Sequence, residues 1–111
     1  MNFDALDEFT KSFKKLERKY PSLPQDLEEL KDMLKVSPEG NGNKFAVLHR
    51  SEKAVIVKAR LFCRYLRESS LRIVYAYHNN IVTFVFLEVF SKSEKDREDQ
   101  QLIRAYLQSI T

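Results

Sequence analysis

Residues 57–95 read VKARLFCRYLRESSLRIVYAYHNNIVTFVFLEVFSKSEK, and the rest of the chain is organised around them. Apolar runs alternate here with arginine and lysine. From residue 54 the apolar period is two, so successive side chains point to opposite faces of a strand. One face is a core face, made by Val55, Val57, Ala59 and Leu61. The other face carries Ile56, Lys58, Arg60 and Phe62, which makes it a mixed basic and aromatic surface.

A β-hairpin follows. Residues 71–78 and 81–90 are predicted strands, and the two asparagines at 79–80 form a good tight turn because asparagine tolerates positive φ. Both faces of this hairpin are apolar, which predicts a central place in the sheet. A two-residue turn would place Arg72 opposite Leu87.

The N-terminal part predicts two amphipathic helices. Apolar residues recur at spacings of three and four over residues 5–19, with Asp4 as the expected N-cap. The prolines at 21–24 break this helix, and Ser22 with Gln25 fits a capping box for the next. The apolar stripe of the second helix is Leu23, Leu27, Leu30 and Leu34. The short connection predicts an antiparallel helix hairpin that covers a sheet.

The remaining segments complete an α+β domain over residues 1–111. Residues 37–43 hold both glycines and are a predicted loop, and residues 45–49 are a predicted short strand. A last helix is expected after a cap at Ser93 or Asp96. Its apolar stripe is Leu102, Ile103, Tyr106, Leu107 and Ile110. The predicted fold is an N-terminal helix hairpin packed on a mostly antiparallel, twisted sheet of about four strands, plus a C-terminal helix.

Composition limits the class of protein. A chain of 111 residues is long enough to bury a core as one domain. Cys63 is the single cysteine, so an intrachain disulfide and a paired-cysteine metal site are excluded. The acidic first residues are not those of a secretory signal, and no apolar run approaches the roughly 20 residues that span a bilayer. We therefore expect a cytoplasmic protein without a membrane partner.

Positive charge is concentrated in the middle of the chain. The net charge of +3 divides into −2 for residues 1–40, +6 for residues 41–80 and −1 for residues 81–111. Within fifteen positions lie Lys58, Arg60, Arg64, Arg67 and Arg72, opposed by Glu68 alone. This density predicts an anion-binding surface with RNA phosphate as its ligand; the alternative is a solvated basic edge.

The common catalytic signatures are absent from the sequence. There is no phosphate-binding glycine loop, and His49 and His78 are isolated. Glu88 is best interpreted as an ion-pair partner for a neighbouring arginine and not as a general base. A basic site can nevertheless cleave RNA, because the ribose supplies the 2′-OH as nucleophile. Arginines stabilise the charge on the phosphate oxygens. Crowding by like charges lowers the pKa of a lysine, so Lys58 is a candidate base.

The order of these elements resembles the RelE/ParE toxin superfamily over nearly the whole chain. The resemblance rests on a helix hairpin, a strand with Lys58 and Arg60, a basic loop, and a last helix behind two short motifs. These motifs are SSLRIVY at 69–75 and FSKSEK at 90–95. Two departures accompany them: Ser70 and Leu71 replace the glycines that are common before the strand arginine, and the early C-terminal tyrosine of RelE has no counterpart.

The resemblance implies a compact α+β toxin with a cognate antitoxin as protein partner. Members of the RelE branch enter the ribosomal A site and cut mRNA without a metal ion or a small-molecule cofactor. The catalytic residues it implies are Arg72, Lys58 and Arg67. The RNA-binding residues it implies are Arg60, Arg64, Tyr65, Lys92 and Lys95. The proton donor is left open, with Tyr65 as a candidate.

Two other functions remain open at this point. Members of the ParE branch poison DNA gyrase without cleaving RNA, and an inactive relative would bind only RNA or a partner. The density of basic residues from Lys58 to Arg72 favours the ribosome-dependent nuclease, because contact with rRNA and mRNA needs many phosphate partners.

Overall fold

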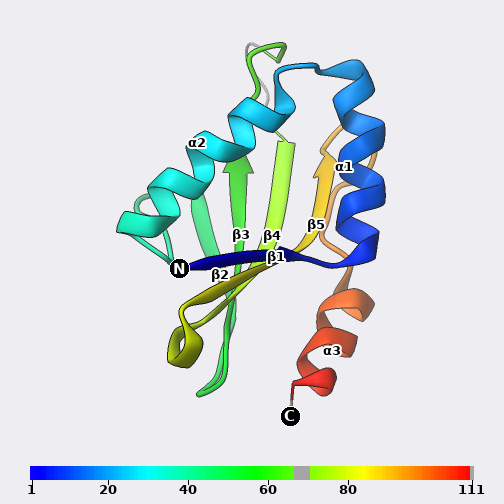
Figure 1. The fold of residues 1–111 in the computed structure, drawn as a ribbon. Coiled ribbons are helices and arrows are strands. Elements are labelled where there is room, and N and C mark those ends of the chain that lie inside the picture. The colour runs from blue at the N-terminus through cyan, green and yellow to red at the C-terminus, as the bar shows by residue number, and fades with distance from the viewer. Residues whose placement is uncertain (67–70, 111) are drawn as a thin grey trace.

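The fold is a sheet with helices on both faces. The computed structural model describes residues 1–66 and 71–110. Within them, α1 and α2 cover one face of a five-stranded sheet and α3 covers the other (Figure 1). The helices are α1 (Asp7–Lys19), α2 (Leu23–Val36) and α3 (Gln100–Ser109), and the strands are β1 (Asn2–Ala5), β2 (Phe45–Arg50), β3 (Val55–Leu61), β4 (Leu71–His78) and β5 (Thr83–Ser91). The strand order is β1-β5-β4-β3-β2, which confirms the predicted α+β class with one strand more than expected.

The additional strand is β1, at one edge of the sheet. It runs parallel to β5, and all other neighbouring pairs in the described sheet are antiparallel. The Phe3 ring stacks on Phe84 with a centroid separation of 4.9 Å. Because residues 2–5 are extended, α1 begins at Asp7 rather than at residue 5. The predicted N-cap Asp4 is wrong: Leu6 occupies that position and makes no side-chain cap bond.

The α2 helix follows its predicted stripe. Leu23, Leu27, Leu30 and Leu34 are all buried against the sheet. Ser22 is the N-cap residue, but the predicted capping box with Gln25 does not form. Instead the Ser22 hydroxyl donates a hydrogen bond of 2.6 Å to Oδ2 of Asp26. The two N-terminal helices diverge from their short connection, so α2 crosses β3 and β2 while α1 lies along β5 (Figure 1).

The β4–β5 hairpin differs from its prediction in register. The turn comprises residues 79–82, with a 3₁₀ segment at Asn79–Ile81 and Val82 in the left-handed region at φ 48°. An irregularity at Val74–Tyr75 shifts the pairing once more. Arg72 therefore lies opposite Phe90 and not opposite Leu87. The longer turn is the physical reason, since a two-residue loop cannot hold the 3₁₀ segment.

Two apolar clusters fix which face each strand residue takes. Val55, Val57, Ala59 and Leu61 pack under α1 and α2, as the alternation predicted. Ile56, Val74, Ala76 and Phe90 pack on the opposite face with Ile103 of α3. A slip of one residue in any central strand would exchange the two sets, so burial on both faces specifies the register.

The last helix begins later than predicted. Asp99 is its N-cap and accepts a hydrogen bond of 3.1 Å from the backbone N–H of Leu102, so Ser93 and Asp96 do not cap it. Residues 92–99 are irregular instead and lie beside the sheet. No helix among the described residues is long and apolar enough to cross a membrane.

One buried hydrogen bond between the sheet and the loop after α2 gives a test of the fold. Tyr75 is fully buried, and its hydroxyl donates to the carbonyl of Pro38 at 2.7 Å. We expect Tyr75→Phe to lower the free energy of unfolding by about 1 kcal/mol, because the carbonyl loses its donor. Urea unfolding checks this, with Tyr65→Phe as control because Tyr65 is exposed. Equal losses in both variants would contradict the assignment.

Candidate functional site

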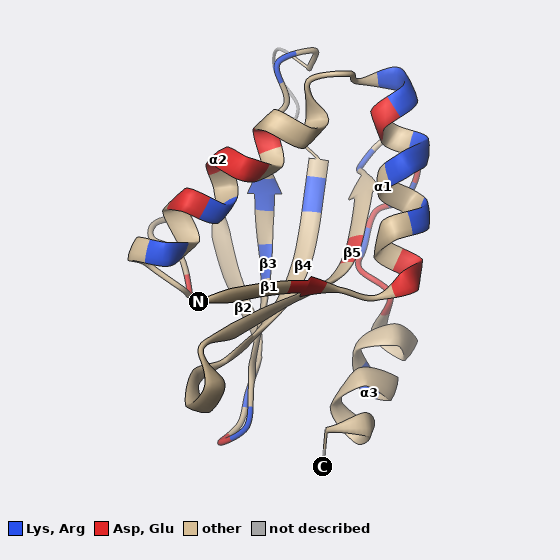
Figure 2. Ribbon diagram, in the orientation of Figure 1, with Lys and Arg blue, Asp and Glu red and all other residues tan. Residues whose placement is uncertain are grey.

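Two arginines from neighbouring strands form the centre of the basic surface. Arg60 of β3 and Arg72 of β4 are directly opposite each other in the antiparallel register. Figure 2 shows their strands blue at the same level of the sheet. Cβ atoms of such partners are about 5 Å apart, and like charges there are destabilising. A pair of this kind is therefore suited to an anion placed between the two guanidinium groups.

The environment of Arg72 increases the electrostatic cost of holding two positive charges on neighbouring strands. Arg72 is half-buried, and burial, followed by the neighbouring charge of Arg60, lowers the pKa of its guanidinium. Both effects disfavour the charged form that arginine nevertheless keeps. A bound phosphate would relieve both, because it supplies opposite charge and hydrogen-bond acceptors.

Lys58 lies on the same face, two residues before Arg60. Its Nζ donates a 2.8 Å hydrogen bond to Oε1 of Glu98, which is nearly buried at the end of the irregular segment before α3. Burial alone would raise the pKa of Glu98. The hydrogen bond and charge of Lys58, with the charge of Arg97, outweigh burial and lower that pKa from its ordinary value of 4.5. Glu98 is thus an ionised acceptor at neutral pH.

A second acid–base pair borders this group. Glu88 of β5 accepts a hydrogen bond from Nζ of Lys95 and another, of 2.8 Å, from the backbone N–H of Asp99. The Lys95 ammonium also lies 5.0 Å from the centre of the Phe90 ring. Glu88 is an ion-pair partner, as predicted, but the predicted arginine is wrong: its partner is Lys95.

The basic cluster is defined here as Lys58, Arg60, Arg72 and Lys95. Glu88 and Glu98 border it. Sequence reasoning missed Glu98, because no local pattern signals a contact between residues forty positions apart. The cluster provides two guanidinium groups and two ammonium groups for contacts with phosphate, and two carboxylates border it.

Other predicted site residues lie elsewhere. Arg64 is held on α2, donating through Nη2 to Oε1 of Glu29 at 3.0 Å. Tyr65 and Lys92 are exposed in the loops after β3 and β5. Arg67 lies outside the described residues. The structure thus brings four of the predicted residues together and leaves the proton donor open.

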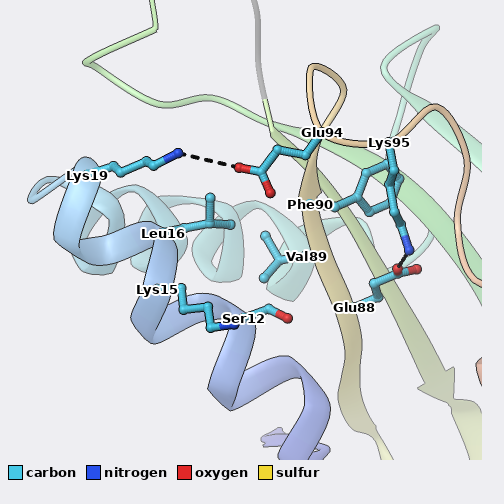
Figure 3. Close-up of a pocket in the computed structure, with 9 residues that line it drawn as sticks. All are labelled: Ser12, Lys15, Leu16, Lys19, Glu88, Val89, Phe90, Glu94 and Lys95. Atoms are coloured by element: carbon cyan, nitrogen blue, oxygen red, sulfur yellow. Dashed lines mark hydrogen bonds and ion pairs between the residues drawn. The ribbon is translucent and has the colours of Figure 1, made fainter.

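A cavity of about 390 Å³ lies on the far side of β5 from β4, between that strand and α1 (Figure 3). Lys15 and Lys19 of α1 line it together with Glu88, Glu94 and Lys95. Lys19 pairs with Glu94 at 3.6 Å. The cavity shares Lys95 with the basic cluster and contains Glu88, which borders that cluster, so the cavity adjoins it.

Comparison with known proteins concerns the fold. The chain superposes on the archaeal RelE–RelB complex structure from Pyrococcus horikoshii OT3 with a TM-score of 0.63, covering 82% of this chain and 93% of that one at 14% identity. It also superposes on a double arginine-to-alanine mutant of the E. coli toxin RelE in the free state, with a TM-score of 0.58, 20% identity, and coverage of 99% and 97%. The chain has a RelE-like fold.

Sequence comparisons add no further relative. No protein-family model matches the chain, and no curated protein matches it. The RelE-like fold was the expectation drawn from SSLRIVY and FSKSEK, and the structural likeness confirms it. At these identities the likeness concerns the fold, so the activity has to be argued from the basic cluster itself.

The Lys58–Glu98 pair predicts a pH dependence of stability. The pKa of Glu98 is lowered in the folded protein, so its contribution is complete above the unfolded value and is lost as pH falls through the folded value. In Lys58→Met, Glu98 stays nearly buried but loses the lysine charge that compensates its own negative charge. We expect this variant to be less stable than wild type at neutral pH, with the difference narrowing below about pH 4 as Glu98 is protonated.

Urea unfolding from about pH 3 to about pH 7 measures this difference. Lys53→Met is the control, because Nζ of Lys53 donates to the carbonyl of Ile110 and not to a carboxylate. Its effect should not vary with pH in the acid range. A Lys58→Met difference that is constant with pH would show that Glu98 is not linked to Lys58.

Proposed function

We propose that this protein is a RelE-type toxin, a ribosome-dependent endonuclease that cleaves mRNA with the ribose 2′-OH as nucleophile. The observation that carries the proposal is the cross-strand pair of Arg60 and Arg72, held at one end of a rigid central sheet. Such a pair brings two arginines side by side on neighbouring strands, and arginine is the side chain best suited to paired hydrogen bonding with phosphate oxygens. The RelE-like fold supports the same conclusion.

The proposed reaction assigns each group a task. Arg72 and Arg60 bind the non-bridging oxygens of the scissile phosphate and stabilise the charge that increases on them in the transition state. Attack by the 2′-OH on phosphorus breaks the bond to the 5′-oxygen of the next nucleotide. Lys58 lies on the same face of β3, two residues before Arg60, and its role as base stays a prediction, as does the part of Arg67.

The contact with Glu98 affects whether Lys58 can act as the general base. In the free protein Lys58 is a hydrogen-bond donor to Glu98, and a general base must instead accept a proton. Either Glu98 releases Lys58 when RNA binds, or the Glu98 carboxylate accepts the proton while Lys58 contacts phosphate. The two side chains are in contact in the free protein, and neither route needs a metal ion or a small-molecule cofactor.

An antitoxin is the proposed protein partner. Acidic side chains already meet the basic cluster from within the chain, at Glu88 and Glu98. A partner with acidic and apolar side chains could cover the remaining positive surface in the same way, with opposite charge speeding the encounter and buried apolar anchors holding the complex. The RelE–RelB complex among the similar structures supports such a pairing. Ribosomes as target would place the protein in the cytoplasm.

Arg72→Ala tests the proposal. Loss of one positioned charge contact to a transition state costs roughly 3–4 kcal/mol, so the rate of the chemical step should fall on the order of a hundred- to a thousand-fold. The measurement is single-turnover cleavage of mRNA on programmed ribosomes. Arg50→Ala is the matched control, because Arg50 is an exposed arginine at the other end of the sheet that pairs with Glu39.

The outcomes separate the candidate functions. Wild-type rates for a folded Arg72→Ala protein would refute the site. A wild-type protein that never cleaves mRNA but stalls gyrase on supercoiled DNA would be a ParE-type inhibitor. A protein that does neither and only binds RNA or its partner would be an inactive relative.

A further inference from the structure

The acid that contacts Lys58 comes from the segment between β5 and α3. Glu98 lies one residue before Asp99, the N-cap of α3. Its Oε1 accepts the 2.8 Å hydrogen bond from Nζ of Lys58, and its Oε2 accepts one of 2.9 Å from the side-chain amide of Gln100. The Glu98 side chain is 9% exposed and that of Lys58 is 28% exposed. In the free protein a nearly buried carboxylate therefore neutralises the Lys58 ammonium.

The backbone around Glu98 is anchored by contacts that its side chain does not make. The backbone N–H of Asp99 donates to Oε1 of Glu88 on β5, and the Asp99 carboxylate caps α3. Beyond the cap, Ile103 packs into the apolar cluster beneath this helix. The Glu98 side chain can therefore rotate away from Lys58 while α3 stays docked on the sheet.

Lys58 lies beside the two arginines that are proposed to hold the scissile phosphate. It is two residues before Arg60 on the same face of β3, so their Cα atoms are about 7 Å apart along the strand. Side chains at this separation can contact different phosphate groups of one RNA strand. A carboxylate and a phosphate also present the same features to an ammonium group, namely negative charge and acceptor oxygens. The place of the Glu98 carboxylate is therefore one that a phosphate can take.

We propose that Glu98 occupies, in the free protein, a subsite for a second RNA phosphate, and that RNA binds Lys58 by displacing this carboxylate. This inference rests on the proposed function for its ligand class. Glu98 then leaves Lys58 when RNA binds and takes no part in proton transfer. The contact is autoinhibitory, because a phosphate has to break it before Lys58 can contribute to RNA binding.

The regular spacing of phosphates favours RNA over an acidic protein as the ligand of this subsite. An RNA strand carries a phosphate at every nucleotide, so binding of one phosphate to Arg60 and Arg72 raises the effective concentration of the next one near Lys58. A partner protein gains no such advantage, because each of its carboxylates depends on its own backbone position. A single free phosphate likewise lacks the linked contacts that compensate for displacing Glu98.

Removal of the Glu98 charge tests the subsite without ribosomes. The probe is a short, fluorescein-labelled single-stranded RNA whose 2′-oxygens are methylated, so that no nucleophile is present. We expect Glu98→Gln to lower Kd roughly five- to tenfold, because Lys58 becomes available to phosphate. The slope of log K against log salt concentration should steepen by about 0.7, the amount for one additional phosphate contact on a single strand. Fluorescence anisotropy at several salt concentrations measures both quantities.

Glu94→Gln is the matched control, because it removes one negative charge from the same irregular segment. Glu94 pairs with Lys19 of α1 at 3.6 Å, across the cavity beside β5 (Figure 3). This variant measures how the loss of any nearby acid affects RNA binding. A Lys58→Met background is the second control: Glu98→Gln should bring no gain there, since no ammonium remains to be released.

Far-UV circular dichroism checks that each variant is folded. Glu98→Asp gives the same test if Glu98→Gln does not fold, because it shortens the side chain by one methylene and withdraws the carboxylate from Lys58. Its Kd should also fall below that of wild type.

Three results would overturn the proposal. The first is equal RNA affinity in Glu98→Gln and Glu94→Gln, or a gain that persists in the Lys58→Met background. The second is tighter binding of a synthetic oligoglutamate with no gain for RNA, which would assign the subsite to a carboxylate of a partner protein. The third is a loss of mRNA cleavage on ribosomes in Glu98→Gln, on the order of a hundredfold, which would make Glu98 the proton acceptor in the RNA complex.

The subsite and the proposed endonuclease fail separately. If Glu98→Gln binds RNA more tightly while the wild-type protein leaves mRNA on ribosomes intact, the subsite stands and the endonuclease falls. If cleavage depends on Arg72 while Glu98→Gln leaves RNA affinity unchanged, the endonuclease stands and the subsite falls.

Discussion

The pairing of β3 with β4 determines where the basic side chains of the central sheet lie. Seven consecutive residue pairs join the two strands, and one of them sets Arg60 opposite Arg72. The register cannot slip, because both faces of the sheet are buried on either side of this pair. Displacement of β3 by one residue would turn Lys58 and Arg60 into the core beneath α1 and α2, and displacement of β4 would do the same to Arg72. Unpaired charges are prohibitively costly there. The apolar cores thus hold like charges together against their repulsion.

The C-terminal segment completes the arrangement. The α3 helix packs Ile103 on the second face of the sheet, and this docking carries Glu98 and Asp99 to the basic cluster. Glu98 meets Lys58, and the backbone of Asp99 meets Glu88. In this way the chain provides its own carboxylates to Lys58 and Lys95. A partner or an RNA that approaches the cluster therefore meets a surface that is already partly compensated.

The predictable parts of the structure are those that depend on local periodicity. Residues 71–78 were predicted as a strand with its observed limits, and the leucine stripe of α2 is buried as expected. The register of β4 with β5 was not predictable, since it depends on a four-residue turn in which Val82, a β-branched residue, takes a left-handed conformation. The β1 strand was missed because its four residues need the edge of β5 to become extended.

In the candidate site too, local sequence patterns were predictive and long-range contacts were not. The sequence identified Lys58, Arg60, Arg72 and Lys95, because clustered charge is visible in one dimension. It did not identify Glu98, whose contact with Lys58 joins positions that lie far apart along the chain. Arg64, also predicted to bind RNA, pairs with two carboxylates of α2 outside the basic cluster, and its role in RNA binding stays a prediction. Charge density along the sequence therefore does not show which basic residues the fold brings together.

The central claim is that the cluster around Arg60 and Arg72 positions a phosphate for attack by the neighbouring 2′-OH. The most direct measurement is the chemistry of the RNA ends after wild-type protein acts on mRNA in programmed ribosomes, read by mass spectrometry. Intramolecular attack leaves a 2′,3′-cyclic phosphate on the upstream fragment and a 5′-OH on the downstream fragment, and these are the ends that this mechanism requires. Fragments with a 3′-OH and a 5′-phosphate, or mRNA that stays intact, would contradict it.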